Sequence, residues 1–266
     1  MADLPPKTVY QQVLDKLDWA KQHIQKLNAA LQRFYDANPV STFTKSDPKT
    51  GDLSYYVGNI PAVSAEIPLI LGDALYSLRD ALDYLACGLV PVVTPDTKFP
   101  IYDSAKNYKS ILGRVVPAIG KDALKVLDSI RPYQGGNLLL WQLHKLNIID
   151  KHRLLLTVCV VNSMRTLRPG EEISATSSLP ERLLLEPREG LPNLIAENVF
   201  SPIPLKAGDK LLTVSTTESE QKVDFYFAVG INEPSIAKGT PLWMLVDFLY
   251  RRVEGVITKL SPFLLR

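Results

Sequence analysis

Four consecutive ionisable residues interrupt an otherwise aliphatic stretch near the middle of the chain. Asp150, Lys151, His152 and Arg153 stand within residues 138–161, which are otherwise mostly apolar. Removing a charged group from water without a partner costs on the order of several kcal/mol, so these side chains need partners from elsewhere in the chain. A histidine can exchange a proton near neutral pH, and neighbouring charges can orient it or stabilise an anion. This stretch is therefore the first candidate for a catalytic or binding centre.

The candidate partners of these residues are Arg79, Asp80 and Asp83, which lie on a second predicted apolar helix. Arg79 and Asp83 are four residues apart, so they share one helical face and can form an ion pair there. Alternatively, the planar guanidinium of Arg79 can reach Asp150 and bind its carboxylate through two hydrogen bonds. The sequence is compatible with both interpretations.

Two histidines in this region are candidates for proton transfer. His144, Asn147 and Lys151 share a helical face, whereas His152 lies about 80° away around the helix. An aspartate two residues from a histidine on a helix points in a different direction, so a direct Asp150–His152 pair requires the helix to end there. Either histidine can instead be a hydrogen-bonded core residue without a catalytic role.

The catalytic hypothesis makes one histidine a general acid or base, oriented by Asp150, with nearby cations stabilising negative charge. Its catalytic set is Arg79, His144, Asp150 and His152. The wider binding or network set is Asp80, Asp83, Tyr84, Asn147, Lys151 and Arg153. The structural hypothesis makes the same residues a buried network that fixes the packing of two core helices.

No metal site or cofactor is predicted from residue spacing. The third histidine, His23, falls on the polar face of the first predicted helix, and the chain has no His-x-x-x-His pair. Cys87 and Cys159 have apolar neighbours and no CxxC spacing, which is typical of buried thiols. Gly135 and Gly136 form a lone glycine pair before a helix, which favours a turn over a phosphate-binding loop.

The composition is that of an ordinary globular protein. The 266 residues are 46% hydrophobic and 22% charged, and the net charge is only +2. Such a small net charge gives no global attraction to nucleic acids or anionic membranes, so any basic binding face has to be local. The N-terminus lacks the pattern of a secretory signal, and the longest uncharged apolar run, residues 154–161, is far shorter than the ~20 residues that span a bilayer. We therefore expect a cytoplasmic protein that does not contact a membrane.

Hydrophobic periodicity predicts a long first helix from Tyr10 to about residue 38, where Asn38-Pro39 ends it. Its apolar residues alternate in steps of four and three and form a heptad-like seam, which consists of Val13, Leu17, Ala20, Ile24, Leu27, Leu31 and Phe34. Such a seam needs a partner, either within its own helical bundle or in a homodimer formed through this helix.

Further helices follow from the same periodicity. A second helix is predicted to open at Pro68, two more cover residues 104–115 and 121–130, and another begins near Asn137. The dipeptide Thr240-Pro241 provides the cap and the first position of a closing helix.

Segments rich in β-branched and aromatic residues predict a short hairpin at residues 40–60 and an antiparallel β-sheet at residues 154–238. The predicted strands of this sheet are residues 154–161, 172–176, 182–186, 210–215 and 223–231. The chain is therefore predicted to be a single α+β domain over residues 1–266. Its helical bundle consists of residues 1–153 and 239–266, with a long N-terminal helix, core helices and a C-terminal helix, and the sheet is inserted into this bundle.

The motifs around the polar residues resemble those of a group of uncharacterised bacterial proteins. The chain reads Leu-Arg-Asp-Ala-Leu-Asp at residues 78–83, Phe-Pro-Ile at 99–101 and Asp-Lys-His-Arg at 150–153. In that group the first helix carries Leu-Arg-x-Ala-Leu-Asp and the later helix ends in Asp-Lys-His-Arg. The resemblance covers residues 60–155 and implies no settled activity.

The first of these helices is also distantly similar to HEPN helical domains, many of which are metal-independent ribonucleases. Their signature is an arginine, often followed by Asn, Asp or His, with a histidine a few residues later on the same helix. Arg79 and Asp80 match its first half, but Tyr84 occupies the histidine position, and a phenol is a poor base at neutral pH. The resemblance implies RNA or nucleotide recognition, with a degenerate ribonuclease site in which His144 or His152 supplies the base. The alternative is a non-catalytic interaction or structural protein.

Overall fold

The computed structural model describes residues 8–37, 40–152, 155–166, 204–214, 223–233 and 236–265. The helices in this part of the chain are α1 (Val9–Ala37), α2 (Glu66–Gly88), α3 (Ala105–Val115), α4 (Lys121–Ile130), α5 (Leu138–His152) and α6 (Leu242–Leu260), followed by a short 3-10 turn, η2 (Ser261–Phe263). The strands are β1 (Thr42–Ser46), β2 (Leu53–Val57), β3 (Val158–Thr166), β4 (Lys210–Val214) and β5 (Val223–Ile231). The predicted α+β fold, with a helical core and an inserted antiparallel sheet, is confirmed.

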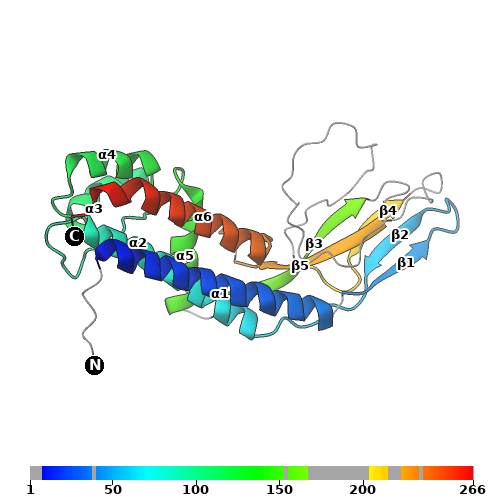
Figure 1. Ribbon diagram of the computed structural model, residues 1–266. Helices are drawn as coiled ribbons and strands as arrows, with labels where there is room; N and C mark the ends of the chain where they lie inside the picture. The colour runs from blue at the N-terminus through cyan, green and yellow to red at the C-terminus, as the bar shows by residue number, and fades with distance from the viewer. Residues whose placement is uncertain are drawn as a thin grey trace, which may run out of the picture.

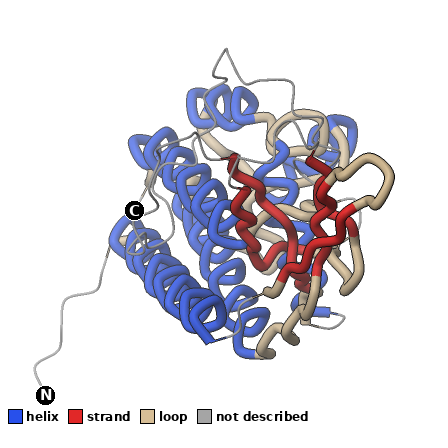
Figure 2. The backbone as a smooth tube through the Cα atoms, turned by 90° about the vertical axis from the view of Figure 1, so that its right-hand side faces the viewer, coloured by secondary structure: helices blue, strands red, loops and turns tan. Residues whose placement is uncertain are grey.

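The long helices α1, α2 and α6 lie alongside one another and form the body of the molecule (Figure 1). The strands gather at one end of these helices, and α3 and α4 lie at the other end. Figure 2, viewed from the strand end, shows the strands in front of the helices. None of the helices among the described residues is long and apolar enough to cross a bilayer.

The seam of α1 is buried within the chain. Its residues Val13, Leu17, Leu27 and Leu31 are at most 5% exposed, and they pack against α2, whose own apolar residues are buried on several sides. Burial of such residues at every third or fourth position supplies the main stabilisation of a two-helix contact. The seam therefore has a partner inside the bundle, and a homodimer through α1 remains a prediction that would have to use its outer face.

Local sequence signals account for some of the helix starts, whereas α2 begins at Glu66, two residues before the predicted Pro68, and its N-cap residue Ala65 makes no side-chain cap. The side chain of Asn137 caps α5 by accepting a hydrogen bond from the Leu140 N–H at 3.3 Å, as predicted. Pro68 lies in the first turn of α2, where its missing N–H costs no helical hydrogen bond. The prediction that Thr240 caps α6 is wrong, because Pro241 holds the N-cap position in an extended conformation and forms a β-bridge with Gly230.

The strands form two antiparallel sheets. The predicted hairpin at residues 40–60 is β1 and β2, and β2 also pairs with β4, which gives a three-stranded sheet in the order β1-β2-β4. Strands β3 and β5 pair separately. The predicted strand at 154–161 is displaced to Val158–Thr166, because α5 extends to His152 and the chain needs several residues to leave the helix. The predicted strands at 172–176 and 182–186 lie outside the described residues.

Candidate functional site

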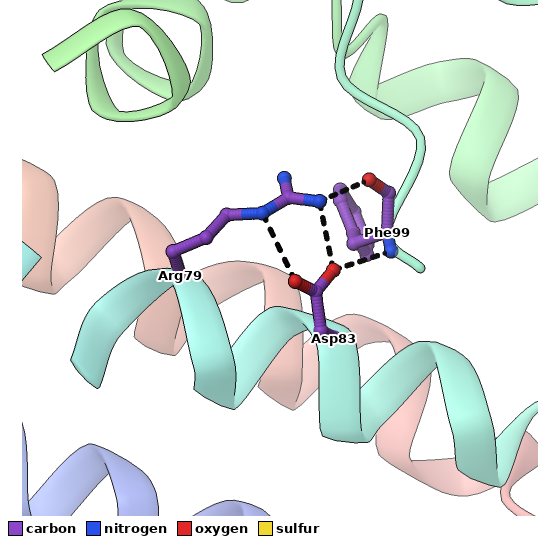
Figure 3. Close-up of polar contacts among 3 residues, drawn as sticks. All are labelled: Arg79, Asp83 and Phe99. Carbon is purple, nitrogen blue, oxygen red and sulfur yellow. Dashed lines mark hydrogen bonds and ion pairs between the residues drawn. The ribbon is translucent and has the colours of Figure 1, made fainter. Parts of the chain in front are cut away.

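Arg79 is buried in the helical body and forms an ion pair with Asp83 on the same face of α2 (Figure 3). Its Nε and Nη2 atoms donate to the Asp83 carboxylate at 3.2 and 2.7 Å, and Nη2 also donates to the carbonyl oxygen of Phe99 at 2.7 Å. The Phe99 N–H donates to the same carboxylate at 2.7 Å. Arg79 is only 4% exposed, so the contacts it makes here are shielded from water.

The sequence explains why Phe99 meets this ion pair. A residue before a proline avoids the helical conformation, so the backbone groups of Phe99, which precedes Pro100, have no helical partners. Arg79 and Asp83 satisfy both groups. Burial raises the pKa of Asp83, while the charge of Arg79 and the hydrogen bond from Phe99 act in the opposite direction.

Asp103 fixes the other end of the segment 99–103 to α5. Its carboxylate accepts a hydrogen bond from Trp141 Nε1 at 2.8 Å and forms an ion pair with Lys145 Nζ at 2.7 Å. The Lys145 contact and the Trp141 hydrogen bond lower the pKa of Asp103. The segment is thus held by α2 at Phe99 and by α5 at Asp103.

Tyr102 lies between these two anchors, and its backbone is fixed as well. Its N–H donates to the carbonyl of Pro132 at 3.1 Å, and its own carbonyl accepts from the N–H of Gln134 at 3.1 Å. The phenolic oxygen of Tyr102, in contrast, is buried and has no hydrogen-bond partner among the described residues. Such an orphaned group costs free energy and is rare in folded proteins.

Two further buried polar atoms also lack partners within the described part of the chain. They are Nη1 of Arg79 and Nδ1 of His144. Burial, together with the charge of Arg79, lowers the pKa of His144 to about 4. The pKa of Tyr102 is raised by burial, and Arg114 and Arg79 oppose this rise. The charge of Arg79 acts on the pKa of both residues, and we define Arg79, Tyr102 and His144 as the Arg79 centre.

The Arg79 centre can donate hydrogen bonds through its guanidinium and phenol, and its imidazole is neutral at pH 7. Lys145 and Lys98 also lower the pKa of His144, and Asp103, the ion-pair partner of Lys145, acts in the opposite direction. The arrangement therefore favours an anion with several acceptor oxygens. Asn147, one turn further along α5, is also buried, and its Oδ1 has no partner among the described residues.

Asp80 and Tyr84 do not belong to the Arg79 centre. Asp80 forms an ion pair with Lys16 of α1 at 2.9 Å. The Lys16 ammonium also lies 5.2 Å from the centre of the exposed Tyr84 ring. Asp80 follows Arg79 and Tyr84 follows Asp83 in the sequence. One position along a helix turns a side chain by about 100°, so Asp80 and Tyr84 face α1.

The expected meeting of the run 150–152 with Arg79, Asp80 and Asp83 is wrong. Asp150 lies against Gly72, and the Lys151 ammonium lies 4.1 Å from the centre of the Tyr76 ring. His152 is exposed as the last residue of α5. The helix ends here, so Lys151 and His152 occupy its last turn and reach water, which removes the burial cost expected for them, while Asp150 stays partly buried. Arg153 lies outside the described residues.

Gly72 and Asp150 form a close contact between α2 and α5. A Cβ atom at residue 72 would lie 2.6 Å from each carboxylate oxygen of Asp150. Burial raises the pKa of Asp150, and the charge of Asp73 adds to this effect. Glycine at this position therefore makes room for a short acidic side chain from the neighbouring helix.

This contact predicts opposite effects of one substitution in two backgrounds. We expect Gly72→Ala to lower the free energy of unfolding by about 1 kcal/mol, because Asp150 must move aside. In the Asp150→Ala background the same change should raise it by about 0.5–1 kcal/mol, since alanine is the better helix former. Urea denaturation of the four proteins measures both values, and equal effects in the two backgrounds would contradict the contact.

Sequence reasoning missed Tyr102, Phe99, Asp103 and Trp141 as parts of the site. The motif Phe-Pro-Ile at residues 99–101 is the available signal, because a proline-fixed segment followed directly by a tyrosine and an aspartate combines backbone restraint with polar side chains. His23, predicted on a polar face, is instead 9% exposed, and its Nδ1 lies 3.9 Å from Asp73.

Among the described residues, no group of three or more His, Cys, Asp or Glu side chains is placed to hold a metal ion. Comparison of the chain with family models, with curated proteins and with solved structures found no match. The similarity to the bacterial group and to HEPN domains thus rests on the sequence motifs alone.

Proposed function

We propose that the Arg79 centre binds a phosphate group of an RNA strand or a nucleotide. The observation that carries this proposal is the presence of three buried polar atoms without partners, on Arg79, Tyr102 and His144. A phosphate offers acceptor oxygens in several directions, so it can accept from the guanidinium and the phenol at the same time. A bound anion would remove the free-energy cost of leaving these groups unpaired.

The ion pair with Asp83 prepares Arg79 for this role. Asp83 and Phe99 occupy Nε and Nη2 of the guanidinium and leave Nη1 unpaired (Figure 3). Arginine binds phosphate with better geometry than lysine because its planar group has fixed donor directions. The bonds to Asp83 and Phe99 restrict the guanidinium further and reduce the entropy that binding would otherwise cost.

A metal-independent cleavage of RNA is the catalytic form of this proposal. His144 is neutral at pH 7, and a bound phosphate, which raises the pKa of an adjacent imidazole, would let it accept the proton of a substrate 2′-hydroxyl. The 2′-oxygen then attacks the adjacent phosphorus, the bond to the 5′-oxygen breaks, and that oxygen takes up a proton. Arg79 stabilises the negative charge that develops on the phosphate. His144 would thus replace the histidine that the HEPN signature places on the first helix, where this chain has Tyr84.

A structural role is the second candidate, and the contacts of Arg79 with Asp83 and Phe99 favour it. These contacts join α2 to the segment 99–103 without any ligand. The two roles make different predictions for Tyr102, because its hydroxyl contributes no hydrogen bond within the described part of the protein.

Tyrosine-to-phenylalanine substitutions at two positions separate the roles. Tyr102→Phe removes an unpaired oxygen, so we expect the free energy of unfolding to stay within about 0.5 kcal/mol of wild type or to rise. The affinity for adenosine monophosphate and for a single-stranded RNA should fall at least about 10-fold, as expected for a lost hydrogen bond to a charged group. Calorimetric titration and urea denaturation measure the two quantities.

Tyr108→Phe is the matched control. The Tyr108 hydroxyl donates to Asp128 at 2.8 Å, so its removal should lower stability by about 1–2 kcal/mol and leave phosphate affinity unchanged. Unchanged affinity in Tyr102→Phe, or no binding of either probe by the wild-type protein, would refute the phosphate site. Cleavage is tested with His144→Gln and with an RNA that carries 2′-deoxyribose at one position, which removes the attacking oxygen at that position.

A further inference from the structure

The outer face of the three-stranded sheet carries an exposed aromatic pair beside a lysine. Phe43 of β1 and Tyr56 of β2 are direct cross-strand partners, and their rings stack with centres 5.4 Å apart at an angle of 15°. The Lys45 ammonium lies 5.6 Å from the centre of the Phe43 ring and 5.1 Å from that of Tyr56. Phe43 is 41% exposed, so stacking leaves much of this pair in water.

Strand register places further polar residues on the same face. Lys45 pairs with Ser54, and Ser54 pairs with Thr213 of β4, whose hydroxyl lies 2.9 Å from that of Ser54. A register shift beside Tyr56 brings Lys210 opposite this ring. Side chains directly opposite each other on paired strands point to the same side of a sheet. We define the sheet platform as Phe43, Lys45, Ser54, Tyr56, Lys210 and Thr213.

The opposite face of this sheet packs inward. Val57, Leu212 and Val214 are at most 4% exposed, and the Tyr55 ring contacts Phe225 of β5. On β4 and at Val57 of β2 one face of the sheet is covered and the other presents the platform, whereas both faces of the edge strand β1 are exposed. A cross-strand aromatic pair adds only modestly to hairpin stability, which leaves the exposed area of both rings without a structural partner among the described residues.

We propose that the sheet platform binds single-stranded nucleic acid. Exposed aromatic rings on a sheet stack unpaired bases, and lysines beside them contact the phosphates between those bases. The platform contains two lysines and no acidic residue, so its charge complements a polyanion, although the net charge of the whole chain is only +2. This inference does not depend on the Arg79 centre, because a strand can be held at the platform whether or not it is cleaved elsewhere.

Fluorescence anisotropy with labelled oligouridine and oligothymidine of about ten nucleotides tests this proposal. Phe43→Val combined with Tyr56→Val keeps residues that favour strands and removes both stacking rings. We expect binding to weaken at least about 10-fold for each oligomer. Phe43→Trp keeps an aromatic ring at this position and should bind both oligomers like the wild-type protein. The double variant Lys45→Gln and Lys210→Gln should reduce the slope of log affinity against log salt concentration by about 0.7 for each lysine removed.

Phe248→Ala is the matched control, because Phe248 on α6 is also 41% exposed but lies away from the sheet. It should bind both oligomers like the wild-type protein, and urea midpoints confirm that each variant is folded.

Three results would overturn the proposal. The Phe43 and Tyr56 double variant could bind the oligomers with wild-type affinity, the protein could bind a duplex as tightly as a single strand, or it could bind polyglutamate in place of the oligomers. Tyr102→Phe distinguishes the two proposals: if it leaves oligomer binding unchanged while the platform variants weaken it, only the Arg79 centre fails.

Discussion

Arg79→Ala lowers the free energy of unfolding by about 3 kcal/mol, the largest effect of any single substitution that we predict. Removing the guanidinium takes from the part-buried Asp83 carboxylate its cation and from the Phe99 carbonyl its charged donor, leaving only the backbone N–H of Phe99 on Asp83 and that of Ile101 on Phe99. The Asp83 side chain keeps 31% of its surface exposed, which places the expected loss at the lower end of the range for broken buried ion pairs. Urea denaturation monitored by circular dichroism measures this value.

Arg33→Ala provides the comparison for this measurement. Arg33 forms an ion pair with Glu66 at 2.9 Å, only slightly longer than the 2.7 Å between Arg79 and Asp83, but both of its side chains are more than half exposed. We expect its removal to change stability by no more than about 0.5 kcal/mol, because water already solvates such a pair. If Arg79→Ala and Arg33→Ala have similar effects, the buried network does not hold α2 to the segment 99–103.

Stability falls as the pH decreases from about 6.5 to about 4, and His144 accounts for much of this loss. Its pKa is lowered to about 4 in the folded protein, whereas an unfolded histidine titrates near 6.5. Between these values the unfolded chain binds a proton that the folded chain does not, so protonation favours unfolding. Above pH 6.5 both states are neutral at this residue, and below pH 4 both are charged. The loss across this window is on the order of 3 kcal/mol.

His144→Gln isolates this contribution from those of other groups. Burial also lowers the pKa of His23, so His23 also contributes to the loss of wild-type stability as the pH falls. The difference between the wild-type and His144→Gln stabilities, measured from pH 4 to 7 by urea denaturation, belongs to His144. Parallel profiles over this range would show that the folded protein does not hold His144 neutral. Bound phosphate should make this loss of stability smaller and confine it to a narrower pH range, since an adjacent anion favours the charged imidazole and raises the folded-state pKa of His144 toward its unfolded value.

Much of the helical body could be predicted from the sequence because its signals are local. The apolar periodicity of α4 gives Lys121–Ile130, which are also its observed bounds, and the seam of α1 identifies the residues that become buried. The pairing of Arg79 with Asp83 is one of the two pairings that the sequence allows, and it follows from their spacing of four residues.

The composition of the site could not be predicted in the same way. Whether a charged run such as 150–152 is buried depends on where α5 ends relative to the core, and periodicity does not fix that relation. Tyr102 approaches Arg79 through the path of a connecting segment, which tertiary contacts determine. The sheet shows the same limit, since β2 pairs with β4 across more than 150 residues of sequence.

Anchoring of the segment 99–103 at both ends has a consequence for how a ligand would associate. Phe99 is fixed to one helix and Asp103 to another, so the Tyr102 hydroxyl between them cannot swing away without breaking one of these attachments. The entropy of ordering this segment is therefore lost when the chain folds, before any encounter takes place. A small anion would meet a rigid receptor, and its capture would follow simple one-step kinetics without a slow rearrangement.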